Sequence, residues 1–452
     1  MFEAKVRLAR AARVVSRRAG RGGTTAPGRL LLKLDEHAIG RLGGRLEDGA
    51  VLLSATNGKT TTAAMLAGIL ERAGEHVVRN RAGSNMHWGV ATALLDAGRR
   101  KGELGLLEVD EAWLPNVAAE LNPRALILCN LFRDQLDRYG ELETLADRWA
   151  DLVEQRDGRS SFVLNADDPL VADLGRERAG VTYFGVEDDS LALPALQHAS
   201  DSKHCRRCGH PYEYEAVYLG HLGRYACPNC GRRRPDAQVA ATRVKLLGMK
   251  GSEVDMRTPA GEISLHLPLP GVYNVYNALA AAASAFALGA GRQHVQDGLE
   301  HVAAVFGRVE TIPVGGRAVS ILLVKNPAGA NEVLRTLTLE DGLIDLWLAL
   351  NDRIADGRDV SWVWDADFEL LAGRVRRATC SGTRAEEMAL RLKYAGIDPA
   401  AIRVERDLGR SLDMAVADRD GGAPLYALPT YTALLDLREL LAERGLAGRW
   451  SD

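Results

Sequence analysis

Short apolar runs alternate with helical segments along most of this 452-residue chain, and this alternation constrains the fold more than any other feature. Runs with the length of buried strands lie at 51–55, 104–109, 125–129 and 162–164, and a second series lies at 319–324, 343–350, 378–380 and 402–404. Parallel strands need helical crossovers, so the alternation predicts a mostly parallel sheet covered by helices on both faces. The expected fold class is therefore α/β.

Changes in composition along the sequence divide it into three parts. We expect a basic N-terminal helical segment at 1–45, a central α/β domain at 46–312, and a separate Rossmann-like α/β domain at 313–452. A segment rich in cysteine and tyrosine, 202–236, interrupts the pattern of the central domain as an insertion.

The formal net charge of −3 conceals an uneven distribution of charge. Residues 1–33 hold nine basic residues and one acidic residue, a net +8, so the remaining residues carry −11. An acidic body argues against a dedicated nucleic-acid-binding protein. Arginines recur through the first 21 residues and leave no apolar segment of a signal peptide, and no run has the length of a transmembrane helix. We therefore expect a cytoplasmic protein.

A strand-to-helix turn with the sequence Thr56-Asn57-Gly58-Lys59-Thr60-Thr61 follows the first apolar run. Backbone N–H groups at such a turn can surround phosphates, Lys59 can reach the β- and γ-phosphate oxygens, and Thr60 can hold Mg²⁺. The turn is a short variant of the phosphate loop in which Ala55 replaces the first glycine. Glu108 ends a neighbouring strand, where a carboxylate would serve as a second ligand of Mg²⁺. These residues predict a nucleotide site with Mg²⁺.

Two pairs of cysteines in the insertion have the spacing of a zinc ribbon. Each pair is a C-x2-C motif, and 18 residues separate the pairs: Cys205, Cys208, Cys227 and Cys230. Four thiolates close the coordination shell, so a bound Zn²⁺ would be structural. The interleaved tyrosines, which are expected to form the small core of the ribbon, are Tyr212, Tyr214, Tyr218 and Tyr225. In the alternative interpretation the ribbon contacts nucleic acid through Arg206, Arg207 and Arg232–Arg234.

Several segments occur in an order that resembles a known enzyme family. They are the phosphate loop, the strand that ends at Glu108, and the segments Asn165–Pro169, Gly271–Ala278 and Gly307–Glu310. Together they resemble the ATP-binding central domain of Mur ligases, which form peptide bonds in cell-wall synthesis. The four-cysteine insertion and the segments Lys325–Gly329, Asn351–Trp362 and Ser381–Glu387 resemble, within that family, the MurT-type subunits of lipid II isoglutaminyl synthase.

The resemblance implies that the chain amidates a carboxylate in peptidoglycan synthesis. Subunits of this type form a heterodimer or larger complex with a glutaminase, GatD, and convert the α-carboxylate of D-glutamate in the lipid II stem peptide to D-isoglutamine. ATP would phosphorylate the carboxylate and ammonia from the partner would displace the phosphate, with Lys59 and Mg²⁺ neutralising charge. Carried over by position, Asn274 would contact adenine and Arg308 the nucleotide.

Two positions depart from the pattern of ordinary Mur ligases. Gln135 stands where those enzymes carry a histidine, and Leu323-Val324-Lys325 replaces an Asp-x-Ala-His segment. Both departures argue against an amino-acid-adding ligase of the Mur or folylpolyglutamate synthase type, which remains an alternative. A further alternative, a zinc-ribbon P-loop ATPase that acts on nucleic acid, conflicts with the acidic body.

The two remaining cysteines do not provide the nucleophile of a glutaminase. Cys129 ends a predicted strand and Cys380 lacks a preceding glycine, so we expect both to be buried core thiols. Glutamine hydrolysis then requires another chain, and the resemblance implies that an aspartate of the C-terminal domain completes the Cys–His pair of that chain. Asp359 matches the position best, with Asp352 and Asp356 as alternatives, although all three could instead cap turns.

The basic residues of the first helical segment are interleaved with Val6, Leu8, Val14 and Val15. Such a helix can be drawn to an anionic lipid surface, which would suit a lipid-linked substrate and a peripheral position at the inner face of the membrane. A solvated or partner-facing helix remains the alternative, because the apolar face is small and rich in alanine.

Overall fold

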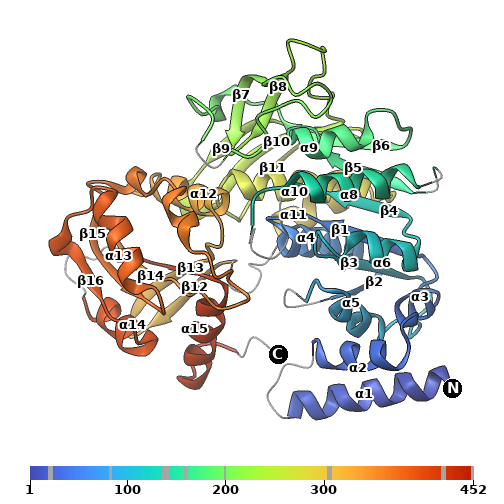
Figure 1. Cartoon of the computed structure of the whole chain (residues 1–452), viewed down its shortest axis with the longest axis horizontal. Coiled ribbons are helices and arrows are strands. Elements are labelled where there is room, and N and C mark those ends of the chain that lie inside the picture. Colours follow the sequence, from blue (N-terminus) through green and yellow to red (C-terminus); the bar gives the residue numbers. More distant parts are fainter. Residues whose placement is uncertain are drawn as a thin grey trace.

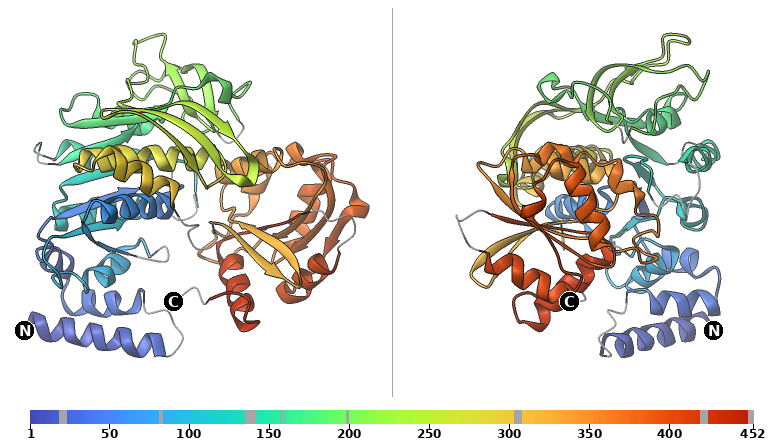
Figure 2. Two further views of the ribbon diagram at one scale, coloured as in Figure 1. Left: turned by 180° about the vertical axis from the view of Figure 1, so that it is seen from behind. Right: turned by 60° about the vertical axis from the view of Figure 1, so that its left-hand side comes forward.

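The computed structural model describes residues 1–18, 24–80, 84–134, 142–156, 158, 160–197, 200–302, 308–418 and 424–448. Two α/β domains lie side by side, each built around its own sheet (Figure 1). The views in Figure 2 agree that the N-terminal helices and the hairpin of the insertion lie at opposite ends of the central domain. Among the described helices, none combines the length and the apolar character needed to cross a bilayer.

The central domain contains a nine-stranded sheet. Its strand order is β11 (Gly261–Leu267), β10 (Ser252–Thr258), β9 (Val239–Leu246), β6 (Val181–Val186), β5 (Ser161–Asn165), β4 (Ala125–Leu128), β1 (Ala50–Ser54), β3 (Glu103–Glu108) and β2 (His76–Arg79). From β2 to β9 all neighbours pair in parallel, which confirms the predicted sheet. The last two strands at one side of the sheet, β10 and β11, pair antiparallel and were not predicted.

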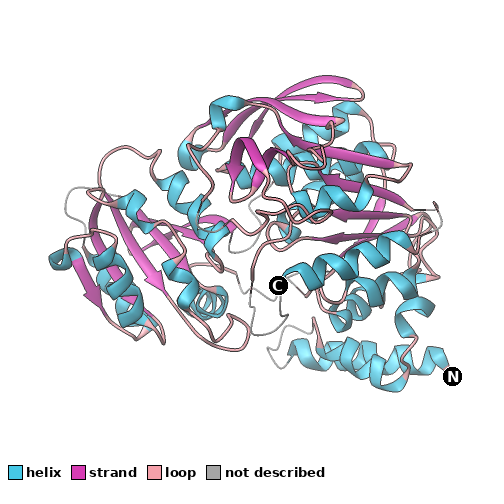
Figure 3. Cartoon of the chain, turned by 45° about the horizontal axis from the view of Figure 1, so that its top comes forward, coloured by secondary structure: helices cyan, strands magenta, loops and turns pink. Residues whose placement is uncertain are grey.

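Helices cover both faces of this sheet, as Figure 3 shows. One face carries α4 (Lys59–Arg72), α10 (Val272–Ala287) and α11 (Arg292–Glu300). The other face carries α5 (His87–Leu94), α6 (Leu114–Leu121), α8 (Leu142–Glu154) and α9 (Pro169–Ala172). Side chains alternate across a strand, so Val51 and Leu53 of β1 enter the first core while Leu52 enters the second. A strand buried on both faces therefore reads as a continuous apolar run.

The N-terminal segment forms three helices that pack on the central domain: α1 (Phe2–Arg18), α2 (Ala26–Leu34) and α3 (Ala38–Gly43). Val6 and Ala9 of α1 are fully buried in the core beneath these helices. Arg10 donates to the carbonyl oxygen of Leu95 at 3.0 Å, and Arg13 pairs with Asp96 at 2.8 Å. The basic helix is thus attached to the domain by its buried apolar side chains and by the contacts of two of its arginines.

The insertion forms a hairpin of β7 (Glu213–Leu219) and β8 (Leu222–Ala226). Tyr212, Tyr218 and Tyr225 are buried, and the rings of Tyr212 and Tyr225 meet edge to face with centroids 4.9 Å apart. The tyrosines are thus buried as predicted, but they do not form a separate core of the ribbon: Tyr212 and Tyr225 join one core of the central domain and Tyr218 joins the other.

The C-terminal domain contains a six-stranded sheet in the order β12 (Arg308–Val314), β13 (Arg317–Leu322), β17 (Leu425–Pro429), β14 (Ile344–Ala349), β15 (Val375–Ser381) and β16 (Ile402–Val404). Its helices are α12 (Pro327–Leu337), α13 (Ala385–Tyr394), α14 (Leu408–Ala417) and α15 (Tyr431–Glu443). Apart from the antiparallel pair β12–β13, the strands are parallel. The expected domain boundary at 312/313 falls inside β12, which pairs wholly within the second sheet.

Candidate functional site: a nucleotide pocket between two domains

The phosphate loop joins the end of β1 to the start of α4, and its backbone leaves no room for a side chain at Gly58. This residue has a φ of 91°, and a Cβ atom built on it would lie 2.0 Å from Oδ1 of Asn277. Glycine tolerates both the positive φ and the close approach. The N–H groups at the first turn of α4 are thereby available to an anion.

Lys59 lies almost buried at the start of α4. Its Nζ donates to the carbonyl oxygen of Ala55 and lies 2.8 Å from Oε2 of Glu111. Burial alone would lower the pKa of Lys59, but the carboxylates of Glu111 and Asp110 raise it above its ordinary value. Burial would likewise raise the pKa of Glu111, yet the ammonium groups of Lys59 and Lys325 hold it below its usual range. Glu111 was not singled out from the sequence, and its contact keeps the amine of Lys59 in the charged ammonium form beside the loop.

Thr60 and Glu108, which the sequence predicts as ligands of Mg²⁺, face each other. The hydroxyl of Thr60 donates to Oε2 of Glu108 at 2.8 Å, and Glu108 is buried. The side-chain amide of Asn80 fixes the backbone of Glu108, since it accepts from the N–H group at 2.9 Å and donates to the carbonyl oxygen at 2.8 Å. A hydroxyl and a carboxylate oxygen at this separation can bind one Mg²⁺ ion next to a phosphate.

Residues of the C-terminal domain contact the phosphate loop directly. Lys325 donates to the carbonyl oxygen of Thr56 at 3.0 Å and forms an ion pair with Asp134. The amide of Asn326 donates to Oδ1 of Asn57 at 3.0 Å. The sequence marked Lys325 as a departure from other ligases and as part of a segment typical of the family, and the structure brings its ammonium group to the loop.

A pocket lies where the two domains meet at this loop, and Asn57, Gly58 and Thr61 line it. The hydroxyl of Thr56 is directed elsewhere and accepts from the N–H group of Phe132 at 3.0 Å. Three loop residues therefore face the pocket and Thr56 fastens the loop to the segment after β4, whereas Lys59 and Thr60 contact Glu111 and Glu108 and are not among the described residues that line the pocket.

Asn274 was expected to contact adenine and Arg308 the nucleotide, and the structure describes the side chain of only the first. Among described residues, Asn277 lines the pocket and Asn274 does not. The amide of Asn274 donates to the carbonyl oxygen of Pro270 at 2.8 Å and accepts from Asn277 at 3.0 Å. Arg308 begins β12, but its side chain lies outside what the structure describes, as does Gln135.

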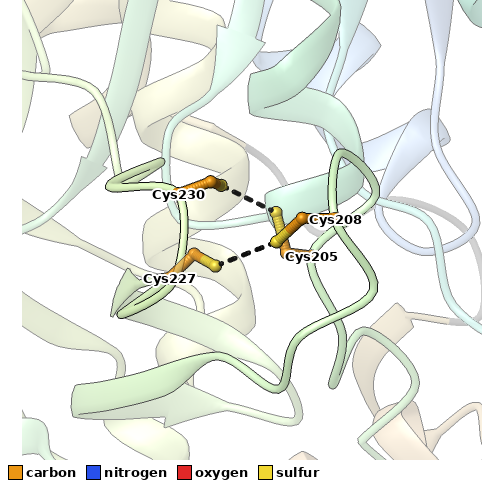
Figure 4. A group of neighbouring side chains, drawn as sticks. All are labelled: Cys205, Cys208, Cys227 and Cys230. Carbon is orange, nitrogen blue, oxygen red and sulfur yellow. Dashed lines mark hydrogen bonds between the residues drawn. The ribbon is translucent and has the colours of Figure 1, made fainter.

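The four cysteines of the insertion converge into a metal-binding cluster (Figure 4). Sγ of Cys205 lies 3.6 Å from that of Cys230, Sγ of Cys208 lies 3.5 Å from that of Cys227, and all four sulfurs lie within 4.8 Å of one another. Tetrahedral zinc with Zn–S bonds of about 2.3 Å requires sulfur separations of roughly 3.8 Å. The donor set therefore fits Zn²⁺.

Arginines of the ribbon are bound to carboxylates of the central domain. Arg232 pairs with Asp173 at 2.7 Å and Arg234 pairs with Asp167 at 2.5 Å. Arg206 also forms an ion pair, with Asp147. These contacts attach the insertion to the domain and occupy cations that nucleic-acid binding would need.

The remaining cysteines are buried, as expected. Cys129 is 4% exposed and Cys380 is fully buried. Burial raises the pKa of both thiols to about 12. Neither forms a thiolate near neutral pH, so neither can act as the nucleophile of a glutaminase.

The three candidate aspartates of the C-terminal domain differ in their contacts. Asp356 is buried and accepts from the N–H group of Thr432 at 2.7 Å, whereas Asp352 pairs with Arg384 at 2.7 Å. Asp359 is exposed, and its carboxylate accepts from the N–H group of Ser361 at 2.9 Å, a contact that lowers its pKa. Of the three, Asp359 has the most accessible carboxylate.

Comparisons with known proteins extend over nearly the whole chain. The family model for the Mur ligase middle domain matches residues 54–231, and the model for the MurT ligase C-terminal domain matches residues 323–434. The lipid II isoglutaminyl synthase (glutamine-hydrolyzing) subunit MurT of Streptococcus pneumoniae is 34% identical over 438 residues, which span 96% of each chain. The subunit of the same name from Staphylococcus aureus is 31% identical and spans 96% of this chain and 97% of its own length.

Solved structures of related ligases share the fold. The pseudomurein peptide ligase type C of Methanothermus fervidus aligns with a TM-score of 0.68 and 23% identity, over 88% of this chain and 79% of that one. Folylpolyglutamate synthase of Mycobacterium tuberculosis aligns with a TM-score of 0.63 and 17% identity, over 92% and 95% of the two chains. Since relatives above 30% identity match 96% of it, the chain belongs to the MurT family of Mur-type ligase subunits.

Proposed function

We propose that the chain is the ATP-dependent synthetase subunit that converts the α-carboxylate of D-glutamate in the lipid II stem peptide to D-isoglutamine. The observation that carries this proposal is the 2.8 Å contact between Thr60 and Glu108 beside the phosphate loop, in a chain that matches two MurT relatives along its length. Those relatives bear the name of a glutamine-hydrolysing lipid II isoglutaminyl synthase subunit.

The loop binds the triphosphate in this proposal. Lys59 exchanges its contact with Glu111 for the β- and γ-phosphate oxygens, and the backbone N–H groups of residues 56–61 surround them. Thr60 and Glu108 hold Mg²⁺, which when bound neutralises charge on the phosphates. Asn274 contributes indirectly by holding Asn277, and Arg308 precedes Val309, which lines the pocket.

The substrate carboxylate attacks the γ-phosphorus atom, the bond from that atom to the β-γ bridging oxygen breaks, and ADP leaves. The resulting acyl phosphate is a much better electrophile than a carboxylate. Ammonia attacks its carbonyl carbon, the bond to the phosphate oxygen breaks, and the amide, inorganic phosphate and a proton are released. The buried charge of Lys59 stabilises the phosphoryl group during the first step because it is already oriented in a site with little water.

Ammonia comes from a separate GatD-like glutaminase chain, where glutamine and water yield glutamate and ammonia. The buried thiols of Cys129 and Cys380 support this division of labour. Asp359 orients the histidine of the partner's Cys–His pair. Large apolar side chains are exposed near Asp359, with Ile354 70% and Trp364 48% exposed, and they support a docking surface there.

Structural Zn²⁺ in the four-cysteine cluster holds the insertion in shape, because it joins the cysteine pairs at 205–208 and 227–230. The protein acts in the cytoplasm, peripherally at the membrane that carries its lipid-linked substrate. Leu8, Val14 and Val15 on the outer side of α1 are more than half exposed and support that position.

Mass analysis of lipid II after incubation with ATP, glutamine and the full chain co-purified with its glutaminase tests the proposal. Amidation changes the mass by the difference between –OH and –NH₂, whereas an amino-acid ligase would add a whole residue, and that product would overturn the proposal. Asp359→Asn should abolish glutamine-dependent amidation and spare amidation with added ammonia. Asp341→Asn, a change at an exposed acid of the same domain, serves as the control.

A further inference from the structure

A buried carboxylate without a hydrogen-bonding partner lies in the pocket between the domains. Glu332 of α12 is 1% exposed, and its Oε1 has no hydrogen-bond partner within the described ranges. Nη1 of Arg335 lies 3.9 Å away, too far for a hydrogen bond, and Arg335 donates instead to the carbonyl oxygens of Tyr218 and Leu191 at 3.0 Å each. Burial raises the pKa of Glu332 to about 7. Because burying an unpaired carboxylate costs free energy, its presence here suggests that a bound ligand supplies the missing hydrogen-bond donor.

Glu332 lies further along α12 than the residues that contact the phosphate loop. Helix α12 begins beside the phosphate loop, where Asn326 bonds Asn57 at 3.0 Å. At about 1.5 Å per residue, Glu332 lies roughly 7 Å further along the helix than Pro327. It shares a pocket-facing side of α12 with Gly329 and Val333. A triphosphate held at the loop would therefore extend its base toward Glu332.

The surroundings of Glu332 suit a flat, largely apolar base. Leu219 and Leu222, at the tip of the insertion hairpin, line this pocket together with Val309 and Leu322. Asn277 also lines it, but its amide already donates to Asn274 at 3.0 Å and accepts from Thr62 at 3.2 Å. Glu332 thus lines the described pocket with a buried carboxylate oxygen, Oε1, that has no hydrogen-bond partner among the described residues.

We propose that Glu332 determines which nucleobase the pocket accepts, because its carboxylate accepts a hydrogen bond from the exocyclic amino group of a 6-aminopurine. The inference rests on the proposed use of ATP. A 6-oxopurine would turn a carbonyl oxygen toward the carboxylate, so two acceptors would meet in a buried site. A purine without a group at C6 would leave the carboxylate unpaired.

Binding of three triphosphates to the full chain with its glutaminase tests this role: ATP, purine riboside triphosphate and ITP, all at pH 8.5. The wild-type protein should bind ATP roughly 10- to 100-fold more tightly than purine riboside triphosphate, and ITP more weakly still. In Glu332→Gln the amide can turn its NH₂ group toward a 6-oxo group, so the gap between ATP and ITP should shrink at least about tenfold. Glu332→Leu should remove the advantage of ATP over purine riboside triphosphate.

Glu340→Gln neutralises an acid of the same domain that bonds Tyr426 and does not line the pocket, so it should keep the wild-type ranking. If wild type binds ATP but Glu332→Gln ranks the nucleotides as wild type does, the role of Glu332 is wrong and the proposed function stands. If wild type binds none of the three, the proposed function fails and this inference fails with it. The isosteric glutamine variant keeps the test valid should the leucine variant unfold.

Discussion

The buried ion pair of Lys59 and Glu111 allows two contributions of Lys59 to be measured separately: its contribution to the stability of the fold and its contribution to ATP binding. The two side chains are 9% and 12% exposed and lie 2.8 Å apart. Lys59→Met leaves the carboxylate of Glu111 buried without its nearest cation, a loss that typically costs about 3–5 kcal/mol. Lys325 also acts on Glu111 and offsets part of that loss. We therefore expect a value near 3 kcal/mol at the lower end of that range.

The double variant Lys59→Met/Glu111→Gln removes both charges and should recover most of the lost stability without recovering ATP binding. Urea unfolding at pH 8 gives the change in the free energy of unfolding, and ATP titration gives the affinity. At pH 5 the unpaired Glu111 can take up a proton, so Lys59→Met should cost less there. Lys250→Met, at an exposed lysine, should change stability by less than about 0.5 kcal/mol. A double variant as unstable as Lys59→Met would refute the reasoning.

Three further predictions concern separate parts of the molecule. Glu332 keeps its proton up to about pH 7 in the folded protein but loses it near pH 4.5 in the unfolded chain, so ionisation destabilises the wild type as pH rises. Urea unfolding should therefore show Glu332→Gln gaining about 3 kcal/mol of stability relative to wild type above pH 7. A stability difference that does not change with pH would contradict this. Cys227→Ser should lose stoichiometric zinc, measured by metal analysis, and should expose residues 202–236 to proteolysis, measured by limited digestion. Zinc retained by this variant would contradict zinc binding by the four cysteines. Leu8→Asp/Val15→Asp should weaken co-sedimentation with anionic vesicles, with Leu339→Asp as the exposed control; unchanged sedimentation would remove the membrane role of α1.

Some of the fold could be predicted because buried parallel strands are apolar on both faces, as Val51, Leu52 and Leu53 are. The antiparallel strands β10 and β11 escaped prediction because they alternate. Val254 and Met256 are buried and alternate with exposed or half-buried residues, and Ile263 and Leu265 follow the same period. That period of two was the signal that could have identified them.

The sequence alone determined the phosphate loop and the four-cysteine cluster, since the chemistry of each depends on residue types at short, fixed spacings. Gly58 and Lys59 are neighbours, and each cysteine pair spans four residues. Only the tertiary structure brought Glu111 to Lys59, across 52 residues, and Asn326 to Asn57, across 269. Only the tertiary structure, likewise, shows that Glu332 lines the pocket between the domains and is not exposed to solvent. Such contacts depend on how two separately folded sheets and an inserted hairpin pack together, and no periodicity within one segment encodes that packing.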